Sequence, residues 1–415
     1  MPIIISALKI VFLLGFLITI HEAGHLLVAK LCKVKVNEFA IGFGPIIWRK
    51  QGKETKYTLR LIPLGGFCNM EGEEERSENQ GSFSKASIPK RMAIVAAGAT
   101  VNIIFGLLVY FILMTTTNTY ITNEINSVID GYAAQEIQLQ QGDKIVKIDG
   151  KKIKNKYDLD KIMSKSTGEV VEIEIDRNGE RLTYNITPTE VQSKSTGMYL
   201  DENAKILSVE KGSSAEKQGI KANDKIIKIN NQEINNDVNK AIEIIKQKGQ
   251  NTILLTIERD KMQINIELTP DTISSYYLGV NLKQAEDTYI NRLIYGGIET
   301  QKFAGSILDN IKMIFTGGVS VDQMMGPVGI SEVVAKTNGI KEFVYMLALI
   351  SLSLGVTNLL PIPALDGGKL LILLIEAIRR KPMNEKTEIN IQLIGFSILI
   401  ALSLYITYRD ILRIF

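Results

Sequence analysis

Apolar residues gather in long runs at both ends of the chain, and a mostly polar region separates them. Four runs are long enough to cross a hydrocarbon core about 30 Å thick, namely residues 4–30, 91–114, 342–361 and 391–408. A fifth stretch, 365–378, is interrupted by Asp366 and two glycines, and we interpret it as a helix buried among the others. The pattern predicts a polytopic α-helical membrane protein with about four transmembrane helices.

The first apolar run could be a removable signal peptide or a retained helix. Its only charged residue, Lys9, lies inside the run, and no cleavage site of the Ala-x-Ala type follows it. Apolar residues continue to about Ala29. We therefore expect a retained transmembrane helix.

The segment 34–70 alternates between apolar and polar residues in places and turns at Gly42-Phe43-Gly44-Pro45. This alternation predicts strands joined by turns. Next to a membrane, such backbone is tolerated where it is paired or covered by protein. We expect a membrane-associated β loop here.

Lysines and arginines concentrate between the first two spans and before the last one, including Arg49, Lys50, Arg379 and Arg380. Because cytoplasmic loops carry an excess of these residues, we expect both segments to face the cytoplasm and region 116–290 to lie outside. Both termini would also lie outside. Cys32 and Cys68 would then be on the reducing side and unpaired.

The polar middle region contains a repeat. Residues 142–153 recur as residues 223–234, and each copy reads as an alternating strand followed by a turn at Asp-Gly or Asn-Asn. The pattern resembles tandem bacterial PDZ domains, for which the phrase Ala-x-x-x-Gly-Ile-x-x-x-Asp-x-Ile, here residues 215–226, is characteristic. The resemblance implies two α+β PDZ domains outside, which either bind peptide C-termini by strand addition or form a rigid shield.

The expected organisation has five parts. They are an N-terminal membrane part with the β loop (1–115), a first PDZ-like domain (116–200), a second PDZ-like domain (201–285), a linker with amphipathic helices (286–340) and a C-terminal membrane part (341–415). The net charge of +3 and the lack of a basic stripe interleaved with aromatic residues argue against a nucleic-acid partner.

The candidate chemistry begins with His21-Glu22-Ala23-Gly24-His25. On a helix, two histidines four residues apart share a face and can bind one zinc ion. Glu22 lies beside them and can take a proton from zinc-bound water. These are the only two histidines of the chain, and they lie inside an apolar span, where ionisable residues are costly and usually functional. The structural alternative is a set of polar groups hydrogen-bonded within a helix bundle.

A catalytic zinc needs a third protein ligand. No histidine remains, so the ligand must be Asp, Glu or Cys, and Asp366 is the best candidate. It follows Pro361 and Pro363, which break the preceding helix, and it precedes two glycines that allow close backbone approach. The alternative is that Asp366 caps a new helix.

The motifs spread along the chain resemble the site-2 protease family of intramembrane zinc proteases, most closely the regulator-of-sigma-E type with tandem PDZ domains. They are His-Glu-x-x-His, Gly42-Phe-Gly-Pro45, Pro63-Leu-Gly-Gly66, residues 96–102 in the second span, the PDZ pair, Gly326-Pro-Val-Gly-Ile330 and Asn-x-x-Pro-x-Pro-x-Leu-Asp-Gly over residues 358–367.

The resemblance implies a Zn²⁺ cofactor bound by His21, His25 and Asp366, with Glu22 as general base. It implies that Asn358 helps to hold the substrate backbone or the developing oxyanion and that the loop 34–70 pairs with unwound substrate. The substrate-binding residues would then be Asn358, Gly42, Phe43, Gly44, Pro361 and Pro363. The substrates would be single-span proteins of the bacterial plasma membrane, such as an anti-sigma factor or a leftover signal peptide, cut toward the cytoplasmic side.

Two positions depart from the family pattern. The chain has Gly98-Ala99 where Gly-Pro is usual, and Lys369 where His is frequent. Neither change removes a ligand or the base. Two rival functions are a catalytically idle membrane scaffold that binds partners through its PDZ domains and a zinc transporter. The first is disfavoured by the complete set of His21, Glu22, His25 and Asp366, and the second by the few ligand-type residues along the spans.

Overall fold

The computed structural model describes residues 2–73, 75–201, 203–247, 252–259, 262–315, 326–337 and 339–414. The chain forms two compact units. The first unit comprises residues 1–116, 299–312 and 325–415, and the second comprises residues 117–298 and 313–324.

In the described residues of the first unit, four helices are long and apolar enough to cross a membrane. They are α1 (Pro2–Leu31), α2 (Ile88–Thr115), α9 (Ile340–Asn358) and α11 (Glu385–Ile414). This confirms the four predicted spans. The fifth predicted helix is α10 (Asp366–Arg379), but it is buried on one face only, since Leu371, Leu374 and Ile378 are exposed.

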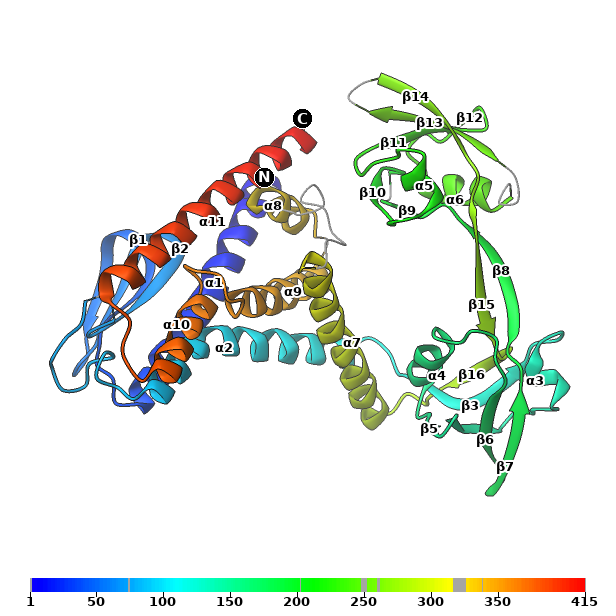
Figure 1. The fold of residues 1–415 in the computed structure, drawn as a ribbon, viewed down its shortest axis with the longest axis horizontal. Helices are drawn as coiled ribbons and strands as arrows, with labels where there is room; N and C mark the ends of the chain where they lie inside the picture. Colours follow the sequence, from blue (N-terminus) through cyan, green and yellow to red (C-terminus); the bar gives the residue numbers. More distant parts are fainter. Residues whose placement is uncertain are drawn as a thin grey trace. The chain divides into compact units, whose positions relative to one another are not determined.

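Helix α2 packs between α1 and α9, and Figure 1 shows α2 and α9 running side by side. Glycines allow these close approaches. A Cβ on Gly24 would lie 2.7 Å from the carbonyl oxygen of Ala97, and one on Gly355 would lie 2.7 Å from that of Ala99. Small residues at helix contacts are typical of membrane bundles, because they let backbones come together. This packing fixes α1 against α2 at the level of the histidines.

The segment 34–70 forms the antiparallel pair β1 (Val36–Gln51) and β2 (Lys56–Met70), as predicted. Several register shifts bend the pair. Figure 1 shows it as a blue hairpin. Large apolar side chains stand exposed along it, including Phe43, Ile47, Trp48 and Leu61, which agrees with contact to a bilayer.

Helix α7 (Tyr289–Phe315) returns the chain to the first unit, where the short helix α8 (Pro327–Ala335) follows. The amide of Gly329 donates to the Asp410 carboxylate over 2.7 Å, and Lys9 donates to the carbonyl oxygen of Thr337 over 2.8 Å. A Cβ on Gly326 or Gly329 would come within 2.8 or 3.0 Å of Asp410. The glycines of the motif 326–330 therefore leave room for the Asp410 carboxylate, which accepts a hydrogen bond from a backbone amide in the first turn of α8.

The second unit contains two copies of one α+β, PDZ-like arrangement. The first copy contains β3 (Ile121–Val128), α3 (Ala133–Glu136), β4 (Lys144–Ile148), β5 (Lys151–Lys152), α4 (Lys156–Met163), β6 (Val171–Arg177) and β7 (Glu180–Ile186). The second contains β9 (Met198–Leu200), β10 (Ile206–Val209), α5 (Ser214–Lys217), β11 (Lys225–Ile229), β12 (Gln232–Glu233), α6 (Val238–Gln247), β13 (Ile253–Arg259) and β14 (Met262–Leu268).

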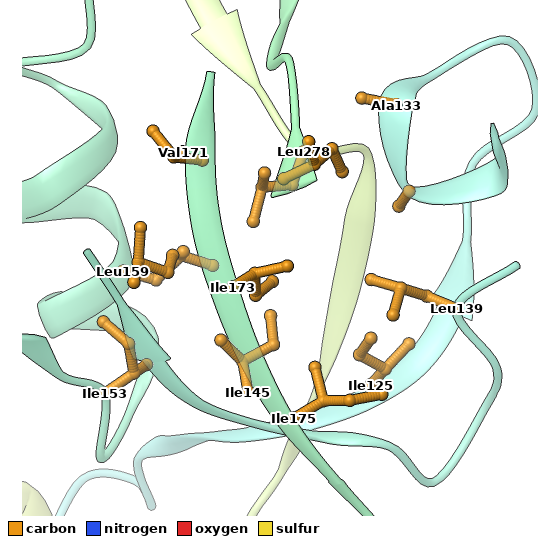
Figure 2. Close-up of a cluster of buried hydrophobic side chains, with 13 residues drawn as sticks. Ile125, Ala133, Leu139, Ile145, Ile153, Leu159, Val171, Ile173, Ile175 and Leu278 are labelled. Carbon is orange, nitrogen blue, oxygen red and sulfur yellow. The ribbon is translucent and has the colours of Figure 1, made fainter. Parts of the chain in front are cut away.

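Each copy has its own core of buried aliphatic side chains. Figure 2 shows the first core, where Ile145 and Ile173 of the sheet lie near Leu159 of α4 and Ile175 lies beside Ile125. The second core repeats this set with Ile226, Leu255 and Ile257 of its own sheet and Ala241 of α6. The repeated sequence therefore encodes a repeated core.

The predicted turns also recur. Asp149-Gly150 joins β4 to β5, and Asn230-Asn231 joins β11 to β12, each with two positive φ angles. Two-residue hairpin turns of this type require that conformation, which Gly, Asn and Asp adopt most readily. The motif thus determines a local hairpin in both copies.

One strand crosses the boundary that the repeat suggests. Strand β16 (Val280–Gln284) pairs with β3, so it lies at the edge of the first copy's sheet, in the order β16-β3-β4-β6-β7. Strands β8 (Thr189–Ser195) and β15 (Asp271–Tyr277) form a two-stranded ladder that connects the copies. Along the chain, the second copy is therefore inserted before the last strand of the first. The five-part division with its ranges remains a prediction.

Candidate metal centre

Three side chains distant in sequence meet in the first unit. Nε2 of His21 lies 3.2 Å from Nε2 of His25. Asp366 Oδ2 lies 3.1 Å from Nε2 of His21 and 3.6 Å from Nε2 of His25. Helix α1 supplies the two histidines on one face, and Asp366 is the first residue of α10. Among the described His, Cys, Asp and Glu residues, these three form the group whose ligand atoms lie close enough to bind one metal ion.

The spacing of the three atoms fits zinc. Bonds of about 2.0–2.1 Å in a tetrahedral zinc site place neighbouring donor atoms about 3.3 Å apart, and the three separations bracket that value. Oδ2 of Asp366 is buried without a hydrogen-bond partner among the described residues. A buried carboxylate oxygen facing two imidazole nitrogens is costly unless a cation joins them.

The other nitrogen of each imidazole is held by α2. Nδ1 of His25 lies 2.8 Å from the carbonyl oxygen of Ile94, which can only accept, so Nδ1 carries the proton. Nδ1 of His21 lies 3.4 Å from the side-chain amide of Asn102. Since amide oxygen and nitrogen are nearly isosteric, Asn102 can accept the Nδ1 proton. Both histidines then direct a lone pair on Nε2 at the centre.

Gly98 of α2 forms the floor of the centre. A Cβ at this position would lie 2.4 Å from Nε2 of His25 and 2.7 Å from Nε2 of His21. Any side chain there would displace the histidines. The backbone of α2 thus approaches the metal-binding atoms as closely as a glycine permits.

Glu22 lies in the same pocket as the three metal-binding side chains. The pocket has a volume of about 500 Å³ and is lined by His21, Glu22, His25, Phe67, Cys68, Asn69, Met70, Glu73, Val95, Asp366 and Lys369. The backbone amide of Cys68 donates a hydrogen bond to the Glu22 carboxylate. Strand β2 therefore forms one wall and orients Glu22.

The structure does not bring every predicted site residue into this pocket. Asn358 is half-buried at the end of α9, and Pro361 and Pro363 follow it in the connection to α10. Gly42, Phe43 and Gly44 lie in β1, where both glycines have positive φ angles. None of these six lines the described pocket. Their assignment to substrate binding remains a prediction.

Other residues were missing from the predicted site. The carbonyl of Ile94, Gly98 and Asn102 come from α2, and Phe67 to Met70 come from β2. The sequence carried a signal for Gly98 and Asn102 alone, because both lie within residues 96–102, which match the family motif of the second span. Nothing in the local pattern shows that Glu73 faces this pocket. Cys68 and Cys32 are free thiols, as predicted.

The chain is similar to known proteases over almost its whole length. The family model "Peptidase family M50" matches residues 9–402. Protease RseP of Yersinia pestis is 28% identical, and the alignment covers 100% of both chains. Zinc metalloprotease RasP of Bacillus licheniformis is 29% identical over 99% of each chain, and Regulator of sigma-E protease RseP of Escherichia coli is 28% identical over 97% of each.

Among solved structures, a PDZ domain protein from Parabacteroides distasonis matches 25% of this chain and 37% of its own, with 14% identity and a TM-score of 0.19. The family model, in contrast, spans both the histidine motif and Asp366. The chain therefore belongs to peptidase family M50, as a zinc metalloprotease of the site-2 protease type and a multi-pass membrane protein.

Proposed function

We propose that this protein cleaves peptide bonds within or near the transmembrane segments of single-span membrane proteins. The observation that carries the proposal is the convergence of His21, His25, Asp366 and Glu22 in one pocket built from helices of the membrane part. Two of these ligand residues and Glu22 lie inside the span α1. A metal centre at that depth acts on backbone that is itself in the membrane.

His21, His25 and Asp366 are the residues that would hold zinc. Zinc bound there would polarise the scissile carbonyl and lower the pKa of water to about 7. Glu22 takes the proton from the attacking water and passes it to the nitrogen of the leaving amine. The amide of Cys68 keeps the Glu22 carboxylate oriented for both transfers.

The substrate must expose its backbone before attack, because a membrane helix keeps its carbonyls in its own hydrogen bonds. Strand pairing with β1 or β2 would hold such an unwound segment. The candidate contacts in β1 are Gly42, Phe43 and Gly44. The others are Asn358 at the end of α9, and Pro361 and Pro363, which lie between the end of α9 and the start of α10.

We infer a membrane-bound regulator of a sigma factor as the substrate class, with a leftover signal peptide as the second class. The inference comes from two relatives, whose names are "Regulator of sigma E protease" and "Regulator of sigma-W protease RasP". We place the protein in the bacterial plasma membrane. The lysine- and arginine-rich segments favour an orientation in which the second unit lies outside and the metal centre lies toward the cytoplasm.

The test uses the full-length protein in detergent with a tagged single-span substrate. Wild-type protein with zinc should cleave it, and removal of zinc by a chelator should stop cleavage. Glu22→Gln should keep zinc bound but lose cleavage by at least about a hundredfold, since a general base contributes about 10²–10⁴. Persistent cleavage by Glu22→Gln would show that Glu22 is not the base, and zinc-independent cleavage would reject the mechanism.

A second role is supported by a cavity in the second unit. It has a volume of about 740 Å³ and lies beside the edge strand β16 and helix α4, with Leu159, Met163, Leu278 and Val280 among its lining residues. An edge strand next to an apolar cavity suits the addition of an extended peptide. We propose that this cavity selects substrates by binding a peptide C-terminus. Met163→Arg should weaken binding of such a peptide to the full-length protein, and unchanged binding would favour the rigid shield.

A further inference from the structure

A lysine and a glutamate complete the wall of the catalytic pocket. Nζ of Lys369 lies 2.8 Å from Oε1 of Glu73, and both side chains line the pocket that holds His21, His25 and Asp366. Among the described residues lining this pocket, Lys369 is the one Lys or Arg. It takes the place where the family often has His, so its charge is permanent at neutral pH.

The ion pair is not needed to hold the loop that carries Glu73. The neighbouring Glu71 anchors this loop, because its carboxylate accepts hydrogen bonds from Asn37, Ser77 and Asn79. The backbone of Glu71 also bonds with Lys35 and Phe83. The Lys369 and Glu73 side chains are 40% and 18% exposed, and an ion pair that keeps contact with water contributes only modestly to stability.

Helix α10 does not explain the lysine either. Lys369 lies in the first turn of α10, three residues after Asp366. A positive charge near a helix N-terminus is unfavourable, because the macrodipole is positive there. Residues three apart share a helix face, so the position directs Lys369 to the side of the metal centre. A binding role in the pocket accounts both for a positive charge at an unfavourable helix position and for the direction of the Lys369 side chain.

The reaction generates a ligand for this lysine. Hydrolysis breaks the C–N bond, places the water oxygen on the carbonyl carbon and moves a proton to the departing nitrogen. The acid product loses its proton at neutral pH, so a new carboxylate arises inside the pocket. Charge-assisted hydrogen bonds from an ammonium to a carboxylate are short and strong.

We propose that Lys369 leaves Glu73 to bind a carboxylate of the polypeptide in the catalytic pocket. This inference rests on the proposed function. The carboxylate is either the new C-terminus of the cleavage product or an acidic side chain next to the scissile bond. The exchange of partners keeps the ammonium paired throughout, and the Glu73 side chain that it releases is partly exposed to water. Lys369 is thus a binding residue for the end of the chain that cleavage creates.

The test measures peptide binding to full-length, zinc-depleted protein in detergent, so that the metal does not contribute. Three fluorescent peptides share one apolar sequence and end in a free carboxylate, in an amide, or in a glutamate with an amide terminus. Wild-type protein should bind at least one carboxylate-bearing peptide about tenfold more tightly than the neutral amide, the size expected for one charged hydrogen bond.

The variants identify the cation. Lys369→Met should lose the carboxylate preference, Lys369→Arg should keep most of it, and Glu73→Gln should increase it by removing the competing partner. Lys35→Met is the matched control, because Lys35 pairs with Glu71 at 3.8 Å and does not line the described pocket. It should bind all three peptides as the wild type does.

If only the peptide with a free C-terminal carboxylate is preferred over the amide, the ligand of Lys369 is the new C-terminus of the product. If the glutamate peptide is preferred equally, the ligand is an acidic side chain. The proposal is overturned if wild-type protein shows no preference or if Lys369→Met retains it. Restoring zinc and assaying cleavage separates the two conclusions. A zinc-dependent protease without carboxylate preference contradicts this inference alone, whereas a carboxylate-binding protein that fails to cleave with zinc contradicts the proposed function.

Discussion

Nδ1 of His25 and the carbonyl oxygen of Ile94 lie 2.8 Å apart, and this contact determines which nitrogen of the imidazole faces the metal centre. The carbonyl can only accept, so the proton resides on Nδ1 and the lone pair on Nε2 points inward. The contact also joins α1 to α2, so the packing of two spans sets the tautomer of a histidine that could bind the metal. Such outer contacts are typical of histidines that bind metals.

Gly98→Ala should weaken zinc binding by at least about tenfold, comparable to the loss of an outer contact of a metal site, and reduce cleavage in parallel. The added Cβ would lie 2.4 Å from Nε2 of His25, and the α1–α2 packing at Gly24 opposes a compensating shift. Competition with a zinc chelator measures the affinity. Gly305→Ala is the control, because a Cβ there meets nothing within 4 Å. Equal affinity in both variants would exclude the proposed crowding.

Asn102→Leu should lower zinc affinity by about 10–100-fold while leaving the spans folded. The side chain is fully buried beside Nδ1 of His21, and leucine has no acceptor for the imidazole proton. Asn102→Asp should retain more affinity than Asn102→Leu, since a carboxylate can accept that proton. Zinc content after dialysis against a weak chelator ranks the three proteins. The reverse order of the two variants would contradict the role of acceptor.

Asp143→Asn should destabilise the first PDZ-like copy by about 2–3 kcal/mol, less than for a fully buried ion pair. Two nitrogens of Arg177 donate to the Asp143 carboxylate, each over 2.7 Å. The Asp143 side chain is 2% exposed, whereas that of Arg177 is 25% exposed. Hydrogen exchange in the full-length protein, read at β4 and β6, measures the change. The same pair recurs as Asp224 and Arg259, which provides a second test.

The stability difference between wild type and Asp143→Asn should shrink in acid. Burial by itself would raise the pKa of Asp143, but the hydrogen bonds from Arg177 and from the amide of Gln140 outweigh it and lower the pKa. The contribution is therefore complete above the ordinary Asp value of about 3.9 and is lost as the pH falls through the lower folded value. A difference that stays constant down to the acid transition would argue against the ion pair.

Cys68 should react far more slowly with alkylating reagents than Cys32 in the zinc-depleted protein. Burial, together with the nearby charges of Glu22 and Glu73, raises the pKa of the Cys68 thiol to about 12. Only about one molecule in 10⁴ would then carry the reactive thiolate at pH 8. Mass spectrometry after timed labelling compares the two sites, with urea-denatured protein as the control. Equal labelling rates in the folded protein would show that Cys68 is accessible and ionised.

Local patterns in the sequence determined much of this protein. Apolar run lengths were sufficient for the four spans, and turn chemistry at Asp149-Gly150 and Asn230-Asn231 was sufficient for the two hairpins. The pair His21 and His25 could be recognised because both share one helix face, a property of i, i+4 spacing. These features depend on neighbours along the chain, so the sequence displays them directly.

Only the tertiary structure decided which distant groups meet. Asp366 reaches the histidines because α10 packs on α2, and Gly98 and Asn102 face them because α1 crosses α2 at Gly24. Strand β16 pairs with β3 across the entire second copy of the repeat. No local pattern contains such contacts, since the free energy of packing depends on surfaces that become neighbours only when the chain folds.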